Sequence, residues 1–189
     1  MISITRLSRA FNVVRDELRE VGLLDDGVYL DQIELVRSPL PSIWTMGYCF
    51  HNGVTWLRLV GYQPGTIYIP INAPVERSSG YTLADVIRHE FGHAWAWLDR
   101  KRIDGPWFKR AFGERYGFPD GVPAPEEDFV SEYAMTRPAE DFADTFMTYL
   151  RHRRNLSRFK NQPGLYRKLR AIEVLVRDTR KHIQQRRRR

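Results

Sequence analysis

The side chains best suited to chemistry in this sequence are His89, Glu90 and His93, which form the pattern His-Glu-x-x-His. Residues four apart on a helix lie on one face, so both imidazole rings can reach a single Zn²⁺ ion. Zinc lowers the pKa of a water molecule bound to it, and the neighbouring Glu90 carboxylate can take the proton as the hydroxide attacks a carbonyl carbon. The pattern therefore predicts two metal ligands and one general base.

The same three residues could instead belong to a solvated helix face that holds no metal. The residues around the pattern argue against this. They are Leu83, Val86, Ile87, Ala94, Trp95, Trp97 and Leu98. Polar side chains amid such neighbours must be paired or bound to a metal, because burying an unpaired polar group is costly. We therefore expect a largely buried helix.

A catalytic zinc site needs a third protein ligand, and two acidic positions compete for that role. Glu140 and Asp144 lie four residues apart in a predicted helix, so one carboxylate can bind zinc while the other accepts the free N–H of a ligand histidine. Asp99 stands where a longer His-Glu-x-x-His pattern has its third ligand, but Ala96 replaces the glycine of that pattern. Glu140 is the favoured ligand. Without a metal, an acidic pair at a helix start is also favourable, and Asp99 would pair with a neighbouring base such as Arg100 or Lys101.

Two segments together resemble the catalytic domain of anthrax lethal factor and related gluzincin-like metallopeptidases and toxin domains. They are the run His-Glu-Phe-Gly-His from His89 and the run Tyr133-x-x-Thr-x-x-Ala-Glu140-x-Phe-Ala-Asp144-x-Phe, and the resemblance covers about residues 86–146. It implies one zinc ion per chain, Glu140 as the third ligand and Tyr133 as the residue that stabilises the transition state. Asp144 stands where some of these proteins carry the longer Glu and keeps its expected place beside a ligand histidine.

The function implied by the resemblance is a zinc-dependent endopeptidase of the effector or toxin type, which hydrolyses peptide bonds of a protein substrate by metal-activated water. A phenol hydroxyl at Tyr133 suits this chemistry because it can donate a hydrogen bond to the developing oxyanion, although a tyrosine there could also serve only in packing. The competing prediction is a zinc-binding, basic module that associates with nucleic acid and has no peptidase activity. Glu90 favours the enzyme, because a structural zinc site has no use for a general base.

The elements that must position these side chains begin with a helix and a group of short strands. Apolar residues three or four apart predict a helix over residues 4–21 that ends at Gly22. Residues 28–71 are rich in β-branched and aromatic side chains and predict three or four strands, taken as antiparallel, with a hairpin at Asn52-Gly53 that leads into a strand over 54–60. A last strand is expected over residues 66–71.

Helices follow the strands. Thr82 and Asp85 resemble a variant of the capping box, so the helix of the His-Glu-x-x-His pattern should begin there. Apolar spacing and proline positions predict three further helices and one loop, over residues 106–116, 138–152 and 164–177 and over the proline-rich 118–125. The fold class expected is α+β and zincin-like, with a small antiparallel or mixed sheet packed on the active-site helix and further C-terminal helices. A single domain over residues 1–180 and a basic, disordered tail over 181–189 complete this prediction.

Composition bounds the partners and the compartment. Part of the net charge of +7 sits in the terminal run Arg186 to Arg189, which favours a solvated tail over an arm for nucleic acid. The first residues lack the apolar region of a secretory signal, and no stretch is apolar enough to span a bilayer. Cys49 is the single cysteine and fits a reducing compartment as a small buried group rather than as a metal ligand with His51. We expect a cytoplasmic protein, or one exported without a signal peptide, whose partner is a protein or peptide substrate.

Overall fold

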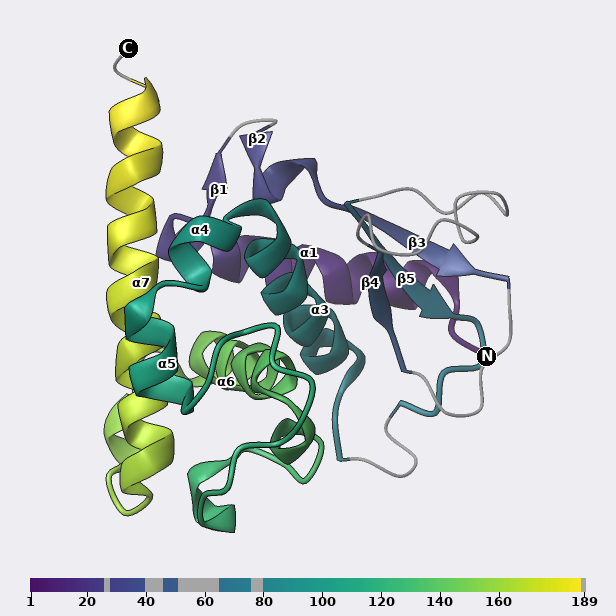
Figure 1. Ribbon diagram of the computed structural model, residues 1–189. Coiled ribbons are helices and arrows are strands. Elements are labelled where there is room, and N and C mark those ends of the chain that lie inside the picture. Colours follow the sequence, from purple (N-terminus) through teal and green to yellow (C-terminus); the bar gives the residue numbers. More distant parts are fainter. Residues whose placement is uncertain (26–27, 40–45, 51–64, 76–79, 188–189) are drawn as a thin grey trace. The chain divides into compact units, whose positions relative to one another are not determined.

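The computed structural model describes residues 1–25, 28–39, 46–50, 65–75 and 80–187. Contacts divide the chain into two compact units, the first made of Met1–Glu20 and Leu24–Leu98 and the second of Val21–Leu23 and Asp99–Arg189. Helices and a small sheet make the protein α+β, as predicted (Figure 1). The sequence predicts a single domain over residues 1–180, and the division into two contact units does not test that prediction.

Helix α1 (Ile4–Val21) opens the first unit at the bounds that the sequence predicts. It buries Leu7, Val14 and Leu18, which lie on one face because successive members are seven and four residues apart. Gly22 follows with a φ of 78°, a left-handed conformation that glycine adopts without steric cost, and this ends the helix.

The sheet of the first unit has the strand order β3-β5-β4 in the described residues. All five residues of the central strand β5 (Thr66–Pro70) are buried. β3 (Glu34–Ser38) pairs with β5 in parallel, whereas β4 (Tyr48–Phe50) pairs with it antiparallel. The sheet is therefore mixed, which is one of the two forms expected for it. The antiparallel pairing expected for the strands of residues 28–71 is wrong for β3 and β5. Parallel neighbours need a crossover connection instead of a hairpin, and turn residues do not reveal which strands a crossover joins.

Two further strands, β1 (Leu24–Asp25) and β2 (Val28–Tyr29), form a separate antiparallel pair that leads into the 3₁₀ helix η1 (Leu30–Gln32). The hairpin predicted at Asn52-Gly53 and the strand predicted over 54–60 lie outside the described residues.

Helix α3 (Leu83–Leu98) carries the His-Glu-x-x-His pattern and begins with the predicted capping box. The Thr82 backbone N–H and hydroxyl donate to Asp85 Oδ2 over 3.0 and 2.7 Å, and the Asp85 N–H donates to Thr82 Oγ1 over 3.2 Å. Two backbone donors at the helix start thereby gain side-chain acceptors. The start of α3 is thus fixed by a local interaction that the sequence predicts.

Arg88 anchors α3 to α1. Its Nε and Nη2 atoms donate to the Glu17 carboxylate over 2.7 and 2.8 Å, and its Nη1 donates to Asp85 over 2.7 Å. Burial alone would lower the pKa of Arg88, but the bonds and charges of the two carboxylates raise it above its ordinary value. Phe11 of α1 also stacks on Phe91, with ring centroids 5.9 Å apart. The helix that carries the histidines is therefore held by both charge and packing.

The Thr82→Ala variant is expected to lose about 1 kcal/mol of unfolding free energy, because the Asp85 N–H loses the hydroxyl acceptor and keeps only the Thr82 carbonyl, and the Asp85 carboxylate loses a hydroxyl donor. Urea unfolding followed by circular dichroism measures the loss. Ser8→Ala, a similar truncation at an exposed position of α1, should change the value by less than about 0.5 kcal/mol. Equal effects of the two substitutions would contradict the capping role.

The second unit is built from helices. Three of them are α4 (Arg100–Ile103), α5 (Pro106–Phe112) and α6 (Pro138–His152), and the 3₁₀ turns η2 (Glu126–Asp128), η3 (Ala134–Thr136) and η4 (Leu156–Phe159) connect the longer elements. α7 (Pro163–Arg187) contacts both α5 and α6. Rings of α5 and α6 form a cluster in the core, with Phe108 stacked on Phe112 and Phe142 stacked on Phe146.

The predicted bounds hold for α6 and differ for α5 and α7. α5 ends at Phe112 because Gly113 takes a φ of 86°, and the expected end at residue 116 is wrong. α7 continues through residues 181–187, where a disordered tail is predicted. Ile183 continues the buried stripe one turn beyond Thr179, so the helix still packs on the core at that point. The loop over 118–125 contains no helix or strand, as predicted. Among the described helices, none combines the length and apolar character needed to cross a bilayer.

Candidate metal centre

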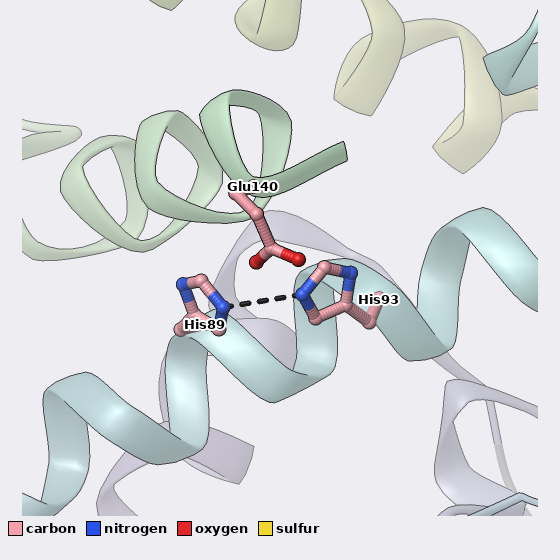
Figure 2. Close-up of side chains that lie close together, drawn as sticks. All are labelled: His89, His93 and Glu140. Carbon is pink, nitrogen blue, oxygen red and sulfur yellow. Dashed lines mark hydrogen bonds between the residues drawn. The ribbon is translucent and has the colours of Figure 1, made fainter. Parts of the chain in front are cut away.

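His89 and His93 are brought together on one face of α3. The two rings are half-buried, and their Nε2 atoms lie 3.1 Å apart (Figure 2). Two nitrogens that bind one tetrahedral zinc ion at about 2.0–2.1 Å lie about 3.3 Å apart. Helical spacing alone therefore sets a separation between the two nitrogens that suits a shared metal ion.

Glu140 lies in the first turn of α6, which begins with Pro138 at a position where its missing N–H costs nothing. Among the described residues, His89, His93 and Glu140 form a group that could hold a metal ion, since each offers one ligand atom and these atoms all lie within 4.8 Å of one another (Figure 2). Two imidazole nitrogens and one carboxylate oxygen are a donor set that zinc accepts at catalytic sites. The residues present thus fit a zinc ion.

Glu90, the expected general base, is buried with 4% of its surface exposed. The chain comes close to it at Gly47. A Cβ atom on Gly47 would stand 3.2 Å from Glu90 Oε1 and 2.9 Å from side-chain atoms of Ile69 and Val86. Gly47 is thus needed for this close approach of the segment before β4 to α3. Burial, and then the charge of Glu90, raise the pKa of the Cys49 thiol far above its usual range. Cys49 therefore stays a neutral thiol, although it is half-buried and not the fully buried group predicted for it. His51 lies outside the described residues.

Ser131, which no sequence pattern singles out, connects Asp144 to the turn that carries Tyr133. The Ser131 hydroxyl donates to the Asp144 carboxylate, and the Ala134 N–H donates to Ser131 Oγ over 3.0 Å. Tyr133 lies between Ser131 and Ala134 in the sequence, at the start of η3, and its side chain is 57% exposed. The bond to Asp144 thus holds the turn that carries Tyr133 against α6. The expected bond of Asp144 to a ligand histidine stays a prediction.

Asp99 lies at the start of α4, where its carboxylate accepts from Arg102 Nε over 2.7 Å. Arg100 or Lys101 was the partner predicted for it from the sequence. An ion pair three residues along the helix accounts for the acidic residue at this position. The group that could hold a metal in the described residues does not include Asp99.

Asp141, the residue after Glu140, forms a buried ion pair with Lys168 that joins α6 to α7. Lys168 is 3% exposed, and its Nζ lies 2.8 Å from Asp141 Oδ2 and donates to the Asp128 carbonyl over 2.8 Å. The same ammonium group lies 3.9 Å from the centroid of the Phe129 ring. Burial raises the pKa of Asp141 to about 6, although Lys168 and Thr145 each lower it. The sequence does hold a signal for this pair, because Lys168 falls on the apolar stripe of α7 and a lysine there requires a partner.

Comparison with known proteins gives no relative, since no protein-family model, curated protein or solved structure matches the chain.

Proposed function

We propose that this chain is a zinc-dependent endopeptidase with a zincin-like fold, in which His89, His93 and Glu140 hold one Zn²⁺ ion per chain. The observation that carries the proposal is the group of two imidazoles and one carboxylate whose ligand atoms all lie within 4.8 Å of one another. Three protein ligands leave a fourth position open for water or substrate, which distinguishes a catalytic zinc site from a structural one.

A zinc ion at this site supplies a Lewis acid that polarises a peptide carbonyl and lowers the pKa of water. Glu90 follows His89 directly on α3 and is the residue proposed to take the proton from the attacking water and to deliver it to the leaving amine. Its burial favours this role, because a carboxylate shielded from solvent exchanges a proton with the reacting groups rather than with bulk water.

Tyr133 is proposed to donate a hydrogen bond to the oxyanion that develops on the substrate carbonyl. Its exposed side chain is accessible to a substrate, and the Ser131–Asp144 bond holds the turn on which it stands. Asp144 is proposed to act on the site as well, through the free N–H of a ligand histidine. The effector or toxin character of the enzyme rests on the sequence resemblance alone. The presence of Glu90 favours a peptidase over a zinc-binding module that associates with nucleic acid.

The experiment that tests the proposal is the zinc content of the purified protein, measured by elemental analysis on the native chain and on two variants. We expect about one zinc ion per chain in the native protein, almost none in Glu140→Ala and the native amount in Asp99→Ala, because only Glu140 belongs to the donor set. Asp99→Ala is the matched control, since it also removes one half-buried carboxylate from a helix start.

Other outcomes would contradict the site. Zinc lost only in Asp99→Ala would move the third ligand to that residue. A native protein that holds no zinc after reconstitution with excess metal would leave the His-Glu-x-x-His pattern without a metal role.

A further inference from the structure

A groove with a volume of about 470 Å³ lies between α5 and α7 in the second unit. Ala111 on α5 and Ala171 on α7 line it with small side chains. Trp107 and Val174 also line it, and 42% of the Val174 surface is exposed. The Trp107 indole N–H already donates to the Arg102 carbonyl over 2.7 Å. The groove thus offers a mainly apolar surface to solvent.

Two arginines stand on opposite sides of this α5–α7 groove. Arg110 belongs to α5 and Arg167 to α7, and both side chains are exposed. Within the described chain, neither guanidinium group makes a hydrogen bond or an ion pair. The other charged residues of the lining are already paired, Arg102 with Asp99 over 2.7 Å and Asp178 with Arg177 over 4.0 Å. The groove therefore has two positive charges that no described residue of the chain pairs with.

We propose that the α5–α7 groove binds an acidic amphipathic helix of a partner protein. An apolar stripe on such a helix would cover Trp107 and Val174, and carboxylates beside the stripe would reach Arg110 and Arg167. Helices bind to grooves between helices in this way, and Trp and Arg supply much of the binding energy at protein interfaces. This surface is separate from the residues proposed to hold zinc, so the inference does not depend on the metal centre.

The groove suits a helix better than the other two classes of ligand. Small-molecule sites enclose about 70–90% of the ligand surface, whereas Val174 and both arginines lie open to solvent. Nucleic acid binds through rows of cations that follow its phosphates, whereas the lining of this groove is mainly apolar and includes the acidic Asp178. Paired carboxylates on an apolar helix are complementary to this arrangement.

Binding is tested with three fluorescein-labelled amphipathic helical peptides that share a leucine face and differ only in carrying Glu, Gln or Lys beside it. Fluorescence anisotropy with the full chain should show binding of the Glu peptide, at least about tenfold weaker binding of the Gln peptide and no binding of the Lys peptide. The Arg110→Glu/Arg167→Glu variant should weaken binding of the Glu peptide by about tenfold or more. Arg9→Glu, a charge reversal at an exposed position of α1, should leave that binding within about twofold of the native value.

A second variant separates the groove from general charge attraction. Ala171→Phe fills the hollow without changing the charge and should also weaken binding of the Glu peptide by about tenfold, while circular dichroism shows a native fold. Equal affinity for the three peptides, or equal loss in Arg9→Glu, would overturn the proposal. So would a DNA duplex that competes with the Glu peptide and loses its own binding in Arg110→Glu/Arg167→Glu, since the groove would then be a nucleic-acid site.

Discussion

The Glu90→Gln variant is expected to hold zinc as the native chain does and to hydrolyse peptide bonds about 10²–10⁴ times more slowly. Glutamine has nearly the shape of glutamate, so it fits the tight space between α3 and Gly47, but its amide cannot accept a proton from water. Neither proposed histidine ligand is altered. Rates are measured by mass spectrometry on peptides that the native chain cleaves from a proteome-derived library.

Glu126→Gln provides the matched control for this loss, because it makes the same chemical change at an exposed position of η2. Its rate and zinc content should equal those of the native protein. Cleavage at the native rate by Glu90→Gln would remove Glu90 from the mechanism. Loss of zinc together with hydrolysis would show that Glu90 maintains the site instead of taking the proton.

The helix bounds that the sequence predicts correctly have local causes. Helix α1 ends at Gly22 because only that residue takes the left-handed conformation without cost. The Thr82–Asp85 capping box starts α3, and Pro138 starts α6. Each signal acts within a few residues of the boundary, so spacing and residue type are sufficient to find it.

Strand pairing and the length of α7 depend on contacts that are distant in the sequence. β3 and β5 pair in parallel although the sequence between them contains turn residues typical of hairpins. In α7 the charged run after Arg177 has the composition of a solvated tail, yet Ile183 is buried and Thr179 is fully buried with a hydroxyl that has no hydrogen-bond partner in the described structure. Because Thr179 is a polar residue in the apolar stripe, the sequence pattern did not predict that the helix continues to Arg187.

The residues of the candidate site also differ in whether local sequence signals are enough to predict them. Helical spacing is enough to predict that His89 and His93 share a face. Ala96 in place of the glycine of the longer pattern favours Glu140 over Asp99 as the third ligand, and the resemblance to known metallopeptidases implies the same choice. Ser131 could not be found in this manner, because its contact with Asp144 joins a loop to a helix. Contacts such as Ser131–Asp144 and Lys168–Asp141 are set by tertiary packing. The sequence indicates such a contact only where a polar residue falls in an apolar pattern, as Lys168 does.

Lys168→Met is expected to lower the free energy of unfolding by about 3–5 kcal/mol at pH 8, measured by urea unfolding with a chelator present. The substitution keeps most of the buried alkyl chain and removes the charge, which leaves the Asp141 carboxylate buried without its cation. The Asp128 carbonyl also loses its donor. Lys160→Met, the same change at an exposed lysine after η4, should alter stability by less than about 0.5 kcal/mol.

Two further measurements identify the unpaired carboxylate as the cause. In the double variant Lys168→Met/Asp141→Leu much of the loss should return, because a buried ion pair can often be replaced by apolar residues without net cost. The loss in Lys168→Met should also shrink as the pH falls from 8 towards 4. Burial already raises the pKa of Asp141 to about 6 with Lys168 present, and removing the cation raises this pKa further. The folded variant then binds a proton that the unfolded chain, with an ordinary pKa of about 3.9, does not, so acid stabilises the variant relative to the native protein. A loss that is equal at both pH values would assign the effect to packing around Phe129 instead of to the charge of Asp141.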